Sequence, residues 1–194
     1  MATKELLYYI PAGQYGKEGV LSLLEQHPEI KFVSLVGIDL AGNDTDEKIP
    51  MAAFFDDYEA FFEGRAVQTD GSSVVLTNIA TLNNARVDMW GDPSVNWFVD
   101  YNYENIDEAT GLPTGTLRIP AFLMHNYRYV DSRSILKRSC DYVRAELLSL
   151  IKEKGVPGMP HVKADDVVDI VFTSATELEF WVKTPSKTVT KKEL

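Results

Sequence analysis

The chain has 194 residues, of which 45% are hydrophobic and 11% aromatic, enough to bury the core of one large domain or two small ones. This composition excludes a generally disordered chain. The net charge is −10, from 19 basic and 29 acidic residues, whereas a surface that binds nucleic acid or anionic membranes normally carries an excess of Lys and Arg. We therefore expect neither nucleic acid nor a membrane as a partner.

The cysteine content and the N-terminal segment predict a cytoplasmic location. Cys140 is the single cysteine, so the chain cannot form an internal disulfide. The first residues lack the apolar stretch and the small-residue cleavage site of a secretory signal. Apolar runs such as 167–172 are far shorter than the roughly 20 residues that a membrane-spanning helix needs.

The first third of the chain predicts a helix, a hairpin and a second helix. Leucines and a valine at helical spacing indicate a helix over 16–27. The β-branched segment 31–40 predicts a strand, which a turn at Gly42-Asn43 returns through 48–49. Five aromatic residues within 51–63 favour a helix that covers a face of a sheet and ends at Gly64.

Further strands are expected in the middle of the chain, at 74–76, 86–90, 97–103 and 116–123. In the third of them, apolar and polar residues alternate, as expected when one face of a strand is wetter than the other. Residues 1–125 are therefore predicted to form an α+β domain, built of a mixed sheet with one or two helices.

The pattern changes after residue 125. Ser132 can cap a long helix whose apolar residues keep a helical period until Gly155. Buried strands are expected at 167–173 and 176–183, followed by a polar, Lys-rich tail. Residues 126–194 hold too few elements to close a core of their own, so we expect them to pack on the first domain or to begin a larger one.

Two segments could carry chemistry. On a strand, Glu177 and Glu179 share a face, and their repulsion is relieved by water, by protonation or by a divalent cation. A solvated strand face and a metal-binding pair are both open interpretations. The sequence Asp-Gly-Ser-Ser at 70–73 is typical of a turn in which the Asp side chain accepts backbone N–H groups, and the alternative is a binding loop in which Asp70 accepts protons or holds a cation. Neither metal-binding His or Cys spacing nor a phosphate-binding glycine motif is present.

Taken together, these segments resemble the beginning of a glutamine synthetase. The resemblance extends over roughly residues 31–183, and an Asp-Gly-Ser-Ser loop followed, after a helix, by Glu-x-Glu-Phe is a specific combination. The segments that carry it are 32–40, 49–50, 69–73, 88–93, 131–138 and 177–180.

The resemblance implies a β-grasp-like N-terminal domain at 1–125 and the incomplete start of a catalytic domain at 126–194. It implies ATP-dependent amidation of glutamate by ammonium through γ-glutamyl phosphate, with Mg²⁺ or Mn²⁺ bound by Glu177 and Glu179. Asp70 would bind ammonium and remove its proton, with the Ser73 hydroxyl beside it. The partners implied are glutamate, ammonium, ATP and further copies of the chain, in a homo-oligomeric ring whose active sites are shared between subunits.

The sequence departs from the family pattern in three places. It ends before the segments that supply the remaining metal, glutamate and phosphate ligands, so we expect an N-terminal fragment that is inactive alone. Residues 74–76 and 174–176 also differ from the usual continuation of the loop and the usual approach to the first glutamate. Two alternatives stay open: a ligase that joins glutamate to another amine, and a non-catalytic module that assembles with full-length subunits.

Overall fold

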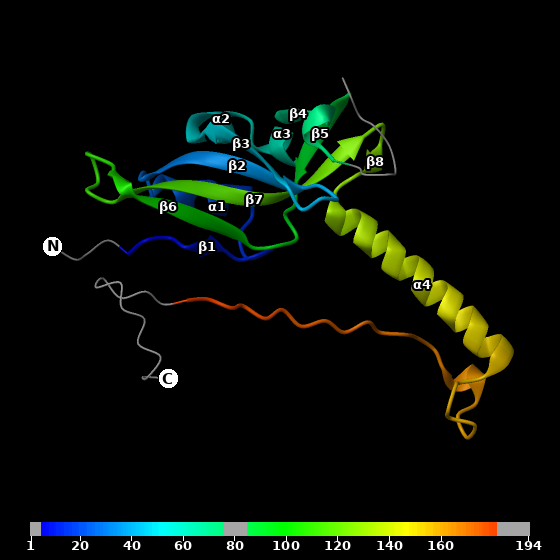
Figure 1. The fold of residues 1–194 in the computed structure, drawn as a ribbon. Helices are drawn as coiled ribbons and strands as arrows, with labels where there is room; N and C mark the ends of the chain where they lie inside the picture. The colour runs from blue at the N-terminus through cyan, green and yellow to red at the C-terminus, as the bar shows by residue number, and fades with distance from the viewer. Residues whose placement is uncertain (1–4, 76–84, 182–194) are drawn as a thin grey trace. The chain divides into compact units, whose positions relative to one another are not determined.

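The computed structural model describes residues 5–75 and 85–181 (Figure 1). The chain forms two compact units, Met1–Ser139 and Cys140–Leu194. The described part of the first unit contains an eight-stranded mixed sheet in which most neighbouring strands are antiparallel. The predicted α+β class is thereby confirmed at the level of a mixed sheet with helices. The domain division predicted at residue 125 stays a prediction.

Two central strands organise the sheet. β2 (Ile30–Ile38) and β7 (Pro113–His125) are parallel neighbours, with Ser34 opposite Arg118. Antiparallel strands extend the sheet on both sides, in the order β1-β6-β7-β2-β3; the added elements are β1 (Tyr9–Ile10), β3 (Asp44–Pro50) and β6 (Trp97–Ile106). The predicted hairpin is confirmed, because β2 and β3 pair antiparallel across residues 39–43.

The far end of β7 carries a second group of strands. There β7 pairs with β5 (Arg86–Gly91) and with β8 (Arg128–Tyr129), and β5 pairs with β4 (Val67–Asp70). The turn expected at 70–73 is present as a 3₁₀ turn, Gly71–Ser73, which follows directly after β4. The strand expected at 74–76 is not present at 74 and 75, and residue 76 lies outside the described residues.

Three short helices accompany the sheet: α1 (Lys17–Glu25), α2 (Met51–Asp56) and α3 (Tyr58–Phe62). The single helix expected over 51–63 is interrupted at Asp57, whose φ and ψ of −140° and 65° are not helical. Phe54 and Phe61 nevertheless stay buried, as the aromatic spacing predicts, and the centres of their rings lie 5.0 Å apart. The core between helices and sheet is apolar; among its fully buried members are Val33, Leu35, Phe54, Leu117 and Ile119.

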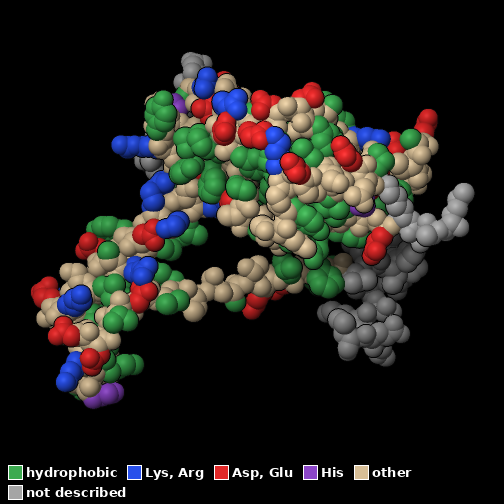
Figure 2. All heavy atoms as spheres, turned by 180° about the vertical axis from the view of Figure 1, so that it is seen from behind, with side chains coloured by type: hydrophobic (Ala, Val, Ile, Leu, Met, Phe, Trp, Pro, Cys, Tyr) green, Lys and Arg blue, Asp and Glu red, His purple; other side chains and the backbone are tan. Residues whose placement is uncertain are grey.

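The long helix predicted after residue 131 is confirmed as α4 (Ser132–Lys154), which ends at Gly155 with φ +80°. None of its residues is buried, and hydrophobic, acidic and basic side chains are interspersed along it (Figure 2). In the described parts of the chain, we find no helix with the length and hydrophobicity needed to cross a bilayer.

The buried strands expected at 167–173 and 176–183 are not present in the described part of these ranges, residues 167–181. Residues 167–181 form neither helix nor strand, and Val168, Leu178 and Trp181 are 88%, 85% and 82% exposed. A strand requires a neighbour for its backbone hydrogen bonds and a layer against which one face is buried. Among the described residues, this segment has no such strand partner. Residues 182 and 183 lie outside the described residues.

Candidate functional site

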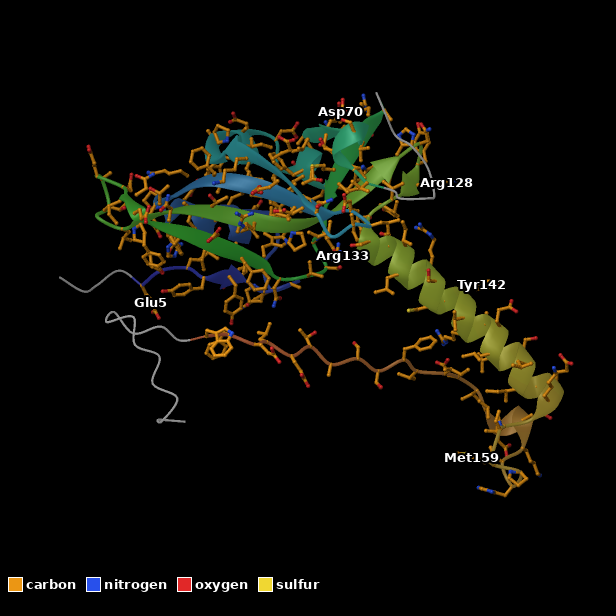
Figure 3. The ribbon with its side chains drawn as sticks, viewed as in Figure 1. Glu5, Asp70, Arg128, Arg133, Tyr142 and Met159 are labelled. Carbon is orange, nitrogen blue, oxygen red and sulfur yellow. The ribbon has the colours of Figure 1, made fainter. Side chains whose placement is uncertain are left out.

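Asp70 lies at the point where β4 ends and a 3₁₀ turn, Gly71–Ser73, begins (Figure 3). Its carboxylate caps that turn, because Oδ1 accepts a hydrogen bond of 2.7 Å from the N–H of Ser72. Asp70 and Ser73 are both exposed. The structure thus places the two residues predicted to act on nitrogen in one short, solvent-facing loop, and it also confirms the local turn chemistry.

The electrostatics of the loop favour the ionised form of Asp70. Hydrogen bonds from the hydroxyl and the N–H of Ser72 hold the pKa of the Asp70 carboxyl below its ordinary value. Arg86, directly opposite on β5, is paired with Asp88 at 2.9 Å. An anionic carboxylate in this position can attract a cation, but its low pKa makes it a weak base in the exposed loop.

Both ends of the loop are anchored by hydrogen bonds to other parts of the chain. At the entrance, the N–H of Gly71 donates to the carbonyl of Ala85 at 2.7 Å. At the exit, the N–H of Val75 donates to Asp39 Oδ2 at 2.9 Å. The sequence predicts no role for Asp39, although an Asp three residues before Gly42-Asn43 is a recognisable turn signal.

Glu177 and Glu179, the predicted metal ligands, are both exposed and lie in the irregular segment after α4. They belong to the second compact unit, whereas Asp70 and Ser73 belong to the first. The described residues contain no cluster of three or more His, Cys, Asp or Glu side chains that could hold a metal ion. Carboxylate oxygens are ligands that Mg²⁺ and Mn²⁺ accept, so the donor type fits, but this pair alone is an incomplete site.

The start of α4 brings together two segments that were singled out in the sequence. Arg133 Nη2 donates to Asp92 Oδ2 at 3.0 Å, and the guanidinium carbon of Arg133 lies 4.7 Å from the centre of the Phe122 ring (Figure 3). Burial would raise the pKa of Asp92, but hydrogen bonds from Ser94 and Arg133 outweigh it and lower the pKa. Segments 88–93 and 131–138 are therefore in direct contact.

The helix cap is not the residue that the sequence predicted. Asp131, which is 1% exposed, accepts the N–H of Ser134 at 2.8 Å and its hydroxyl at 2.9 Å, and Oδ2 also accepts the N–H of Leu123 at 3.3 Å. Ser132 is the first helical residue, so it stands one position too late to cap α4.

Comparison with known proteins adds evidence from solved structures alone. No protein-family model matches the chain. No curated protein matches it either. Among solved structures, the chain is similar to a cryo-EM structure of Plasmodium falciparum glutamine synthetase, with 15% sequence identity and a TM-score of 0.45 over 71% of this chain. The chain spans 24% of the length of that protein. An overlap this loose does not establish a common fold.

Proposed function

We propose that this chain is part of a glutamine synthetase-type ligase, which amidates glutamate with ammonium at the expense of ATP. The observation that supports it best is the exposed, anionic Asp70 in its Asp-Gly-Ser-Ser loop, together with the later Glu177-x-Glu179 pair. In this proposal, residues 1–125 with their mixed sheet form a β-grasp-like N-terminal domain, and residues 126–194, including α4, begin the catalytic domain. A cytoplasmic location is part of the same proposal.

The proposed role of Asp70 is to bind ammonium and then to remove its proton. Ammonium has no lone pair and cannot attack γ-glutamyl phosphate until a proton leaves, so a carboxylate must first attract the cation and then accept the proton. The loop is exposed here, and covering it would raise the pKa of Asp70 through desolvation. We propose that a neighbouring subunit in a homo-oligomeric ring provides this cover, with the Ser73 hydroxyl beside the bound cation.

Glu177 and Glu179 are proposed as ligands of Mg²⁺ or Mn²⁺. A divalent cation at this pair would offset the negative charges that glutamate and the ATP phosphates bring together during phosphoryl transfer. Because two carboxylates are fewer ligands than such a cation takes, further oxygen ligands must come from other residues, from substrates or from water.

The test is ATP-dependent glutamine formation by the native oligomer that contains this chain. We expect Asp70→Asn to reduce kcat/KM for ammonium by about 10²-fold or more, because it removes both the attracting charge and the base. The matched control is Asp57→Asn, which alters an exposed carboxylate between α2 and α3. The proposal fails if the oligomer forms no glutamine, or if Asp70→Asn is as active as the control. Preference for methylamine over ammonium would instead support a γ-glutamyl-amine ligase.

The exposed segment 167–181 favours a second candidate, a non-catalytic module that assembles with longer subunits. Phe180 and Trp181 are 80% and 82% exposed in a segment without secondary structure, as expected of a chain that becomes ordered on a partner. Sedimentation of the purified chain, alone and mixed with a full-length subunit, tests this candidate. A monomer that ignores the subunit would contradict it.

A further inference from the structure

Asp39 carries an inference that goes beyond the roles proposed so far. Its side chain is fully buried, and it binds both its own turn and Val75, which lies 36 residues further along the chain. We propose that Asp39 is a positioning residue: it fixes the exit of the loop 70–75 and thereby the direction in which Asp70 is presented. This inference rests on the proposed function of Asp70.

The two carboxylate oxygens of Asp39 have different tasks. Oδ1 accepts the N–H groups of Ala41 and Asn43, each at 2.9 Å, and so closes the turn between β2 and β3. Oδ2 accepts the Nδ2 of Asn43 at 3.0 Å and the N–H of Val75 at 2.9 Å. The N–H of Leu40 also donates to the carbonyl of Val75 at 3.3 Å, so residue 75 is held by its donor and by its acceptor.

These bonds complete the anchoring of the loop. Its entrance is already held, because Asp70 pairs with Arg86 in the sheet and Gly71 is bonded to Ala85. The exit is held by Asp39 and by the burial of Val74, which is 4% exposed. Asp70, Ser72, Ser73 and Val75 face solvent, whereas Gly71 and Val74 are buried. A loop ordered before the ligand arrives loses less conformational entropy on binding, which raises its apparent affinity.

The local turn does not explain why a carboxylate is buried here. A two-residue turn such as Asn-Gly closes a hairpin without any buried charge, and a buried carboxylate is unfavourable unless donors surround it. Burial would raise the pKa of Asp39, but hydrogen bonds from Asn43, Val75 and Ala41 outweigh it and lower the pKa. The feature that distinguishes Asp39 from an ordinary turn residue is its bond to Val75.

The test uses Asp39→Asn, because an amide keeps only one acceptor oxygen. We expect that oxygen at the Oδ1 position, where two backbone N–H groups point, so that the NH₂ group stands at the Oδ2 position and cannot accept from Val75. The matched control is Asp107→Asn, since Asp107 closes another turn by accepting the N–H and the hydroxyl of Thr110. Hydrogen exchange of the whole chain is followed by NMR. We expect Asp39→Asn to accelerate exchange of the amides of residues 72–75 about tenfold or more, with protection in β2 and β7 unchanged. The control should leave the loop unchanged.

A second variant keeps the test decisive if Asp39→Asn does not fold. Val75→Pro removes the N–H donor at a residue that is 37% exposed and leaves Asp39 and its turn intact. We expect the same selective loss of protection in the loop. Unchanged loop amides, or an equal acceleration throughout the sheet, would overturn the positioning role.

Kinetics of the native oligomer separate this inference from the proposed function. We expect Asp39→Asn to raise the KM for ammonium about tenfold with little change in kcat, because fewer molecules hold the loop in its binding conformation. Faster loop exchange with an unchanged KM would refute the inference. Absence of glutamine formation in the wild-type oligomer would refute the proposed function instead, while the exchange result, which needs no substrate, would still report on the anchor.

Discussion

The cap of α4 permits a direct comparison between two neighbouring residues. The structure assigns the cap to Asp131, which binds Ser134 and also the N–H of Leu123 in the sheet. We therefore predict that Asp131→Ala destabilises the protein and that Ser132→Ala does not. The two substitutions lie one residue apart at the same helix end. A difference in stability between the two variants therefore reports which residue caps the helix.

The magnitude follows from the bonds that each substitution removes. Loss of an Asp cap costs about 0.5–2 kcal/mol, and an N–H of buried Leu123 left without this acceptor costs about 1–3 kcal/mol. We expect a decrease of about 2–4 kcal/mol in the free energy of unfolding for Asp131→Ala. Ser132→Ala should change it by less than about 0.5 kcal/mol, because Ser132 is a first-turn helical residue.

Urea unfolding, followed by tryptophan fluorescence and by circular dichroism, measures both variants. Asp131→Asn is the intermediate case, since it keeps an acceptor oxygen but loses the negative charge that favours the helix N-terminus, and we expect a cost of about 1 kcal/mol. The reasoning is refuted if Ser132→Ala is as destabilising as Asp131→Ala, or if Asp131→Ala leaves the unfolding midpoint unchanged.

Three further predictions concern other parts of the chain. Gly64→Ala should lower the free energy of unfolding by about 2–4 kcal/mol, because Gly64 has φ +67° and an added Cβ would lie 1.8 Å from Trp90 Nε1; a loss below about 1 kcal/mol in urea unfolding would contradict this. Because the pKa of Asp92 is lowered in the folded state, its carboxylate should stabilise the fold fully above the unfolded-state pKa near 3.8. This stabilisation should be lost as the pH falls through the lower folded-state pKa. Asp92→Asn should remove that part of the acid sensitivity in unfolding curves recorded from about pH 2 to 6. Mn²⁺ titration followed by electron paramagnetic resonance should show weak binding, with a Kd on the order of 1 mM, that is lost when Glu177 and Glu179 are both changed to Gln; retention of binding in that variant would contradict the assignment.

Elements with a strong local pattern could be predicted from the sequence. The hairpin between β2 and β3, the helices α1 and α4 and the strands β5 to β7 lie where apolar spacing and turn residues place them. The Asp-Gly-Ser-Ser segment was also expected to form a turn capped by its own Asp, and Asp70 does cap it. Such features depend on residues a few positions apart, so the local sequence contains the information that determines them.

Other features depend on contacts between distant residues, and only the tertiary structure decided them. The Asp39 carboxylate accepts the N–H of Val75. The Asp131 carboxylate accepts the N–H of Leu123 in β7 as well as capping its own helix. Neither partner can be predicted from the neighbouring sequence. The segment 167–181 has the composition of a buried strand, but composition does not provide the neighbouring strand with which its backbone must pair. A strand forms where a second strand provides backbone donors and acceptors for it, and the position of that second strand is determined by the tertiary fold.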